Sequence, residues 1–275
     1  MSAKFAFIGA GNMGGAMAEA IVRAKGPESV LLYDHNEEKA KALAEKTGCG
    51  VAESARDAVF GGDYVLLCVK PKMLPGVLKG LLPYFEQAKA GGDKKVLVSI
   101  AAGVAVESIK SILQDGGVSL PVIRLMPNTP VLVGKGLVLV MPSEDAGEGE
   151  VSVLMDALSA AGETELFDEK LVDAATPVFS SSPAFGYMFI EAMADGGVMA
   201  GVPRDKAQKL AAISMLGAAA MVLETGKHPG QLKDEVCSPG GSTIVGVEVL
   251  ERAGFRAAAA QAVYEAYIKT TQLGK

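Results

Sequence analysis

Three glycines near the start of the chain have a spacing that is typical of phosphate binding. Gly9, Gly11 and Gly14 form the pattern G-x-G-x-x-G, between an apolar run and a helical pattern. The first glycine permits a tight turn, the second lets the backbone approach a pyrophosphate, and the third lets the helix pack closely on the strand. The helix N-terminus then offers N–H groups and a positive dipole to the phosphates. The pattern predicts a dinucleotide site, and a purely structural turn is the alternative.

An acidic side chain stands where such a site meets the adenosine ribose. Asp34 follows the second apolar run, 20 residues beyond Gly14. A carboxylate at this position hydrogen-bonds the ribose 2′-OH and repels a 2′-phosphate, which favours NAD. The alternative is a helix cap, because Asp34 and Asn36 precede the next helical pattern.

Three loops rich in proline and small residues follow apolar runs farther along the chain. They are Val69–Pro71, Ser99–Gly103 and Met126–Pro130. Ligands of open α/β sheets bind outside the carboxyl ends of the strands. These loops are candidates for rigid walls beside a flat nicotinamide ring, although each also suits an ordinary turn.

A fourth motif, Ser238–Thr243, has the features of a small anion site. Gly240 and Gly241 expose backbone N–H groups, while Ser242 and Thr243 begin an apolar helical pattern. A helix start of this kind can hold a small carboxylate. Taken alone, the motif suits a capped turn equally well.

Short apolar runs alternate with helical patterns over the first two-thirds of the chain. This alternation predicts a doubly wound α/β domain with a parallel sheet. After Asp168 the chain contains only helical patterns, so we expect one domain over residues 1–167 and an all-helical domain over residues 168–275. The predicted strands are Phe5–Ile8, Val30–Tyr33, Tyr64–Val69, Val96–Ile100, Val122–Met126, Gly136–Met141 and Thr164–Phe167.

Composition argues against several classes of protein. The 275 residues carry a net charge of −6 and have no Lys/Arg run, which argues against nucleic-acid binding. Two histidines and three separated cysteines predict no metal site and suit a cytoplasmic protein with reduced thiols. The most apolar helical pattern, residues 209–224, has about 14 apolar-dominated residues, short of a bilayer span. We expect no membrane association, and a helix buried in a core or between subunits.

Several motifs occur together along the chain. In their composition and order they closely resemble those of pyrroline-5-carboxylate reductase. The last of them, followed by Leu250–Phe255, is the most specific. The motifs are Ile8–Gly14, Val69–Pro71, Ser99–Gly103, Met126–Pro130, Ala194–Val198, His228–Asp234 and Ser238–Thr243.

The resemblance implies a Rossmann-type N-terminal domain and a helical dimerisation domain, with assembly into homodimers and often decamers. It implies reduction of 1-pyrroline-5-carboxylate to L-proline by NADPH or NADH, the last step of proline biosynthesis. The substrate carboxylate would bind Gly240, Gly241, Ser242 and Thr243, and the Thr243 hydroxyl would hydrogen-bond the ring nitrogen as the catalytic group. The fingerprint and the resemblance together give these cofactor-binding candidates: Gly9, Gly11, Asn12, Met13, Gly14, Asp34, Val69, Lys70, Pro71, Ala101, Gly103 and Asn128.

The chain departs from the family pattern at three places. Ala55 stands where many members carry Asn near the adenosine, and Asp34–Asn36 replaces the Ser, Thr or Arg of members that prefer NADP. Both departures put the usual NADPH preference in doubt. Ser180 and Ser182 replace family glycines at the start of a C-terminal helix, where a backbone contact is then altered.

Two other functions fit these residues less well than imine reduction does. A hydroxyacid dehydrogenase needs a general base, but His35 belongs to the adenosine end and His228 has no recognisable acidic partner. The G-x-x-x-K-x-x-x-N pattern of β-hydroxyacid dehydrogenases is also absent. A regulatory module that senses the coenzyme would not need the second anion site at Ser238–Thr243.

Overall fold

The computed structural model describes residues 4–273, which form two compact units. The first unit comprises residues 4–175 together with residues 271–273, and the second covers Thr176–Thr270.

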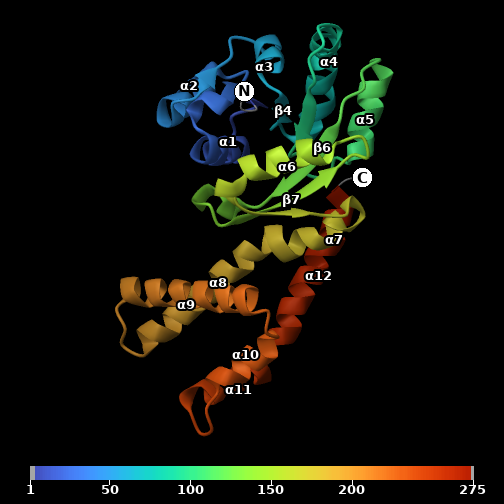
Figure 1. The fold of residues 1–275 in the computed structure, drawn as a ribbon. Coiled ribbons are helices and arrows are strands. Elements are labelled where there is room, and N and C mark those ends of the chain that lie inside the picture. Colours follow the sequence, from blue (N-terminus) through green and yellow to red (C-terminus); the bar gives the residue numbers. More distant parts are fainter. Residues whose placement is uncertain (1–3, 274–275) are drawn as a thin grey trace. The chain divides into compact units, whose positions relative to one another are not determined.

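The first unit is built on one eight-stranded sheet with helices on both of its faces (Figure 1). The strand order is β3-β2-β1-β4-β5-β6-β7-β8, so the order reverses between β1 and β4. This reversal is the hallmark of a Rossmann-type doubly wound sheet, which confirms the predicted fold class. The strands are β1 Phe5–Ile8, β2 Val30–Tyr33, β3 Gly50–Val51, β4 Tyr64–Leu67, β5 Val96–Ser99, β6 Val122–Pro127, β7 Gly136–Pro142 and β8 Gly162–Leu166.

Alternate side chains of the buried strands enter two separate cores. Phe5 and Phe7 of β1 join the core under α1 and α6, whereas Ala6 and Ile8 join the core under α3, α4 and α5. Because both faces are covered, the strands consist of apolar residues on both sides. The helices of this unit are α1 Asn12–Lys25, α2 Glu37–Thr47, α3 Ala55–Gly61, α4 Leu74–Ala90, α5 Val106–Asp115, α6 Glu148–Ala157 and α7 Val172–Thr176.

The predicted parallel pairing holds for β1 to β6, and the pairing of β7 with β6 departs from it. β7 pairs antiparallel with β6, with Leu125 opposite Val140, and β8 then pairs parallel with β7. The connection between β6 and β7, residues 128–135, is shorter than the dozen or more residues that a parallel crossover needs. The two-residue strand β3 was also missed, because Gly50–Val51 is too short to show a periodicity.

The first unit continues past β8 because of a partly buried ion pair. Oε1 of Glu169 accepts hydrogen bonds from Nη1 of Arg124 at 2.8 Å and from the Val106 backbone N–H at 2.9 Å. Arg124 lies in β6 and Val106 begins α5, so Glu169 fixes the segment after β8 to the body of the sheet.

The second unit is entirely helical, as predicted. A π-helical turn, Pro177–Ser181, contains Ser180 and leads into α8, whose first residue is Ser182. Among the described hydrophobic residues after Thr176, the buried ones are only Ala194, Ala207 and Ala211. The helices are α8 Ser182–Met199, α9 Arg204–Thr225, α10 Pro229–Val236, α11 Ser242–Arg252 and α12 Phe255–Leu273.

Helix α9 contains the apolar stretch that the sequence analysis singled out. By length and composition alone it could cross a membrane, but one such helix is weak evidence for a membrane span. Most of its large apolar side chains are exposed, including Leu210, Leu216 and Leu223. The helix is therefore not buried in the core of its own chain.

Tyr64 gives the first unit a measurable response to alkaline pH. Its hydroxyl donates to the Glu150 carbonyl at 2.9 Å, and its ring stacks on Phe5. Burial, aided by the charges of Glu150 and Asp63, raises the pKa of Tyr64 from 10.0 to about 12. Between these two values the unfolded chain loses the phenolic proton before the folded chain does, so the free energy of unfolding falls as pH rises.

We expect Tyr64→Phe to be about 1 kcal/mol less stable at neutral pH, because it loses the hydrogen bond. Its stability should also decline less steeply than that of the wild type between about pH 10 and 12, because the ionising group is gone. Urea unfolding over this pH range measures both effects. Parallel stability curves for the two proteins would show that Tyr64 does not cause the response.

Candidate active site

A pocket opens at the carboxyl ends of β1 and β4, where the strand order reverses. The chain leaves β1 into α1 on one face of the sheet and leaves β4 toward α4 on the other face. This divergence opens a crevice in doubly wound sheets. The cavity has a volume of about 580 Å³ and is lined by the glycine turn, the end of β2, the loop after β4 and one side of α4.

The glycine turn is packed tightly on one side and open on the other. A Cβ atom on Gly9, which has φ +112°, would lie 2.4 Å from the Cys68 carbonyl oxygen. A Cβ atom on Gly14 would lie 2.5 Å from the Gly9 carbonyl oxygen. A Cβ atom on Gly11 would meet no atom within 4 Å. The first and third glycines therefore let β1, β4 and α1 come together, and the space over Gly11 suits a pyrophosphate at the N-terminus of α1.

Asp34 braces the glycine turn from the neighbouring strand. Its carboxylate is only 8% exposed, and it accepts hydrogen bonds from the Ala10 N–H at 2.7 Å and the Asn36 N–H at 2.9 Å. Asn36 is the residue before the first turn of α2, so Asp34 does not bond the free N–H groups of that turn. This geometry places the carboxylate in the wall of the cavity, and neither of its two hydrogen bonds reaches the first turn of α2.

Three basic side chains line the same pocket as Asp34. His35 lies beside it, with Nδ1 3.1 Å from Asp34 Oδ1, and Lys39 and Lys70 also contribute to the lining. Ala55, the first residue of α3, lies here too, so the departure from the family Asn falls in the pocket wall.

One side of α4 forms a wall that the sequence analysis did not identify. Met73, which precedes the helix, and Gly76, Val77, Gly80 and Tyr84 within it all line the cavity. Cβ atoms on Gly76 and Gly80 would meet nothing within 4 Å. Two glycines four residues apart weaken a helix by about 1 kcal/mol each, so their spacing was the signal of a face left open.

The other cofactor candidates fall into two groups, one beside the pocket and one that does not line it. Asn12, Met13 and Gly14 form the first turn of α1, while Val69 and Lys70 line the pocket and Pro71 begins the short helical turn after it. Ala101 and Gly103 belong to the loop between β5 and α5. Oδ1 of Asn128 accepts from the Leu137 N–H at 2.9 Å, which braces the β6–β7 connection. Ala101, Gly103 and Asn128 are not among the residues that line this cavity.

The substrate candidates lie in the second unit, at the start of α11. Gly240 has φ +70°, and the Gly241 N–H donates to the Ser238 carbonyl at 3.0 Å, closing a turn. Ser242 and Thr243 form the exposed first turn of α11, and no side chain caps it. The N–H groups of this turn therefore point to solvent and can donate hydrogen bonds to a carboxylate.

Comparisons with known proteins find family matches for both parts of the chain. Residues 169–273 match the family model for pyrroline-5-carboxylate reductase dimerisation, and residues 4–103 match the model for NADP oxidoreductase, coenzyme F420-dependent. The pyrroline-5-carboxylate reductase of Escherichia coli K12 is 40% identical over 278 residues, covering 100% of both chains. The chain belongs to the pyrroline-5-carboxylate reductase family. Its members are NAD(P)H-dependent oxidoreductases, and this chain is one of them.

Solved structures of family members share the whole fold. The pyrroline-5-carboxylate reductase of Coxiella burnetii has a TM-score of 0.88 at 26% identity and covers 100% of both chains. The Plasmodium falciparum pyrroline carboxylate reductase has a TM-score of 0.83 at 28% identity, covering 99% of this chain and 98% of that one, and has NADP bound. The open cradle over Gly11 fits such a dinucleotide. Within residues 4–273 no group of three or more His, Cys, Asp or Glu side chains could hold a metal ion.

The open face of α4 predicts opposite effects of two substitutions at Gly80. Gly80→Ala should raise the stability by about 1 kcal/mol, because alanine is the better helix former and its methyl group meets empty space. Gly80→Leu should weaken NADPH binding by about tenfold, because the longer side chain enters the cavity. Thermal melts and titrations of coenzyme fluorescence measure the two effects. Wild-type affinity in Gly80→Leu would place the nucleotide elsewhere.

Proposed function

We propose that the two units divide the family reaction, the reduction of 1-pyrroline-5-carboxylate to L-proline. The cavity at β1 and β4 holds the coenzyme, and the turn from Gly240 to Thr243 holds the substrate. The observation that supports this division is a pair of free anion sites, one over Gly11 and one at the uncapped start of α11. A dinucleotide and a carboxylate each need one such site.

In the first unit, the chain's residues bind and orient the coenzyme, which supplies a hydride when it is bound in reduced form. The N–H groups at the start of α1 receive the pyrophosphate over Gly11, with Asn12 and Met13 beside it. Asp34 faces the adenosine ribose, and Val69, Lys70 and Pro71 border the chain of the dinucleotide. Ala101, Gly103 and Asn128 are proposed to lie toward the nicotinamide end. Placing the reacting groups in this way accounts for much of the rate enhancement.

In the second unit, the substrate is held by its carboxylate. The N–H groups of Gly240, Gly241, Ser242 and Thr243 receive it, and the Thr243 hydroxyl hydrogen-bonds the ring nitrogen. Hydride addition at the imine carbon leaves a secondary amine. A cyclic imine takes up a proton in water, so Thr243 orients the nitrogen and the protein needs no strong acid.

The geometry of the two histidines weighs against the oxidation of a hydroxy acid. His35 lines the pocket beside Asp34, at the adenosine end. Nδ1 of His228 accepts a hydrogen bond from the Gly230 N–H at 3.0 Å. His35 has the Asp34 carboxylate as a partner but lies away from the proposed nicotinamide end, and no carboxylate pairs with His228 within residues 4–273, so neither imidazole suits the role of general base for alcohol oxidation.

The role of Thr243 is tested by its two nearest isosteres. Thr243→Val removes the hydroxyl and should lower kcat/KM for 1-pyrroline-5-carboxylate by about tenfold, the cost of one hydrogen bond to the substrate. Thr243→Ser keeps the hydroxyl and should retain most of the activity. Steady-state kinetics at saturating NADPH measures both. Equal losses in the two variants would show that the activity does not depend specifically on the hydroxyl, which would contradict the proposed role of Thr243.

The coenzyme preference is tested at Asp34. We propose that the chain uses both coenzymes, with NADH less disfavoured than in typical members, because the carboxylate repels a 2′-phosphate. Two unit charges about 4 Å apart interact by up to roughly 4 kcal/mol near a protein surface, which exposure and salt reduce. Asp34→Ser should therefore improve the KM for NADPH and worsen it for NADH.

Asp34→Asn is the matched control, because it keeps an oxygen that can accept from the Ala10 N–H while removing the charge. It should shift the ratio of the two specificity constants in the same direction as Asp34→Ser. An unchanged ratio in both variants would leave Asp34 as a brace for the glycine turn alone.

We propose that the helical unit forms a homodimer in the cytoplasm and that homodimers can assemble further into a decamer. Exposed side chains on α8 and α9 support this proposal, among them Met188 at 69% and Leu223 at 81% exposure. Such a quantity of exposed apolar surface is unusual for a monomer. The free thiols Cys49, Cys68 and Cys237 suit a reducing compartment.

Light scattering combined with activity measurement tests the assembly. The active species should have at least twice the mass of the chain at every concentration at which activity persists, because the apolar faces of α8 and α9 need a partner. An active monomer at low concentration would refute the proposed obligate dimer.

A further inference from the structure

His228 holds the start of α10 through an acceptor that exists only in one protonation state of the ring. The residue is the N-cap of α10, and its Nδ1 accepts a hydrogen bond from the Gly230 N–H at 3.0 Å. Pro229 occupies the first helical position and has no N–H, so Gly230 carries the first free amide of the helix. An imidazole protonated at Nδ1 is a donor there and cannot accept this bond.

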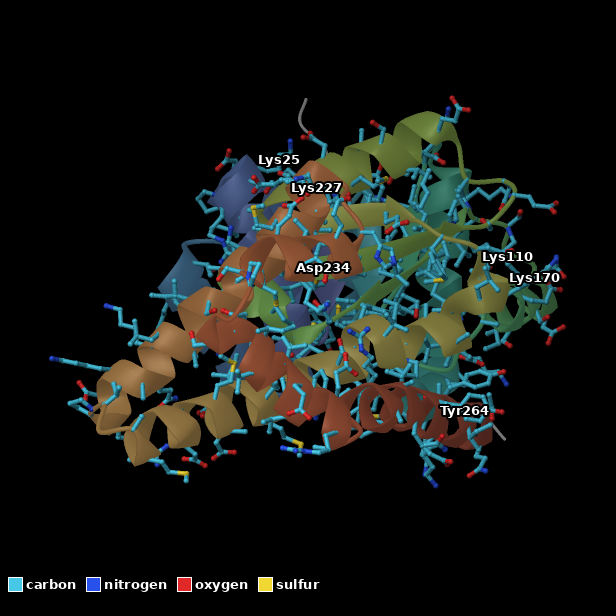
Figure 2. All side chains as sticks on the ribbon, turned by 90° about the horizontal axis from the view of Figure 1, so that it is seen from below. Lys25, Lys110, Lys170, Lys227, Asp234 and Tyr264 are labelled. Atoms are coloured by element: carbon cyan, nitrogen blue, oxygen red, sulfur yellow. The ribbon has the colours of Figure 1, made fainter. Side chains whose placement is uncertain are left out.

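Helix α10 depends on a small number of local contacts. It has eight residues, all of them described, and none is buried. Nζ of Lys227 lies 2.9 and 3.1 Å from the two carboxylate oxygens of Glu235, and Nε2 of Gln231 donates to Glu235 Oε1 at 3.1 Å. Lys227 precedes the helix and Asp234 lies near its end (Figure 2). A helix this short is marginal in water, so each terminal bond matters to its formation.

The end of α10 leads directly into the turn that is proposed to hold the substrate carboxylate. The Cys237 N–H donates to the Asp234 carbonyl at 3.0 Å, and the Gly241 N–H then donates to the Ser238 carbonyl at 3.0 Å. A Cβ atom on Gly241 would lie 2.5 Å from Ser238 Oγ, so the turn is compact. Loss of α10 as a helix would release the first residues of this turn.

We propose that His228 is a pH-sensitive positioning residue for substrate binding. With Nδ1 unprotonated, the ring caps α10 and thereby fixes the turn from Ser238 to Thr243. Protonation removes the acceptor and places a positive charge at the positive end of the helix dipole, and both changes loosen α10. The inference rests on the proposed role of this turn as the carboxylate site.

The charged groups around His228 do not compensate a charge on its ring. Glu224 is the last residue but one of α9, which packs against α10. The remaining charged groups nearby in the chain are Lys227, Lys233, Asp234 and Glu235. Glu235 pairs with Lys227, and Asp234 pairs with Lys233. Among residues 4–273 no carboxylate oxygen lies within ion-pair distance of the His228 imidazole, in contrast to His35.

Two variants separate the cap from its titration. Asparagine is a preferred N-cap and does not titrate, so His228→Asn keeps an acceptor at all pH values, whereas His228→Ala has none. KM and kcat for 1-pyrroline-5-carboxylate are measured from pH 5.5 to 8 at saturating NADPH. Titration of the substrate and of the coenzyme phosphate affects all three proteins equally, so only ratios between them are compared.

At pH 8 the wild type and His228→Asn should have similar KM values, and His228→Ala should have a KM about three- to tenfold higher, as the loss of a helix cap predicts. At pH 5.5 the wild-type KM should rise toward that of His228→Ala relative to His228→Asn, with kcat little changed. A KM ratio of wild type to His228→Asn that stays constant with pH would overturn the inference. So would a wild-type KM in His228→Ala at pH 8.

A second measurement needs no substrate and so distinguishes this inference from the proposed function. Amide hydrogen exchange over residues 230–241, corrected for the chemical exchange rate, should show protection that falls between pH 8 and 5.5 in the wild type and stays constant in His228→Asn. Equal pH dependence in both proteins would overturn the titrating cap. A wild type that is inactive on 1-pyrroline-5-carboxylate would instead refute the proposed function, while the exchange result still decides the role of His228.

Discussion

The close approach of the glycine turn to the end of β4 sets the geometry on which the cofactor site depends. Gly9 and Gly14 let the backbone of β1 and α1 come within contact distance of Cys68, where any side chain would collide with main-chain atoms. The approach brings the N-terminus of α1 to the reversal point of the sheet. Asp34 then fixes the turn from the other side, through the Ala10 N–H. Partial burial in the same place raises the pKa of the Cys68 thiol above its ordinary value.

The two units use their apolar residues in different ways. In the first unit the strands lie between two helical layers, and most large apolar side chains are buried in one of two cores. In the second unit the large side chains of α8 and α9 remain exposed within the single chain. The first unit is therefore organised around its own cores, and the second leaves an apolar surface exposed within the chain. The match of residues 169–273 to a dimerisation family agrees with this difference.

The sequence predicted those features that depend on local patterns. The apolar runs located seven of the eight strands, and the spacing of Gly9, Gly11 and Gly14 located the tight turn between β1 and α1. The direction of β7 was missed because an apolar run does not encode direction, although the short connection of residues 128–135 limited it. The open face of α4 was missed because Gly76 and Gly80 look like weak points of a helix until the space beside them is known. The bond from Ala10 to Asp34 joins residues 24 apart, which no local pattern can show. The roles of Gly240 to Thr243 remain predictions from resemblance.

The most direct test of the account is the oxidation of reduced nicotinamide by the purified chain, followed by absorbance with one candidate substrate at a time. We expect NADPH and NADH to be consumed when 1-pyrroline-5-carboxylate or a close cyclic imine acid is supplied, with proline as the product from the former. The reverse assay, with oxidised coenzyme and a 2-hydroxy or 3-hydroxy acid, should give no comparable rate. Turnover of a hydroxy acid without any turnover of the imine would contradict the account.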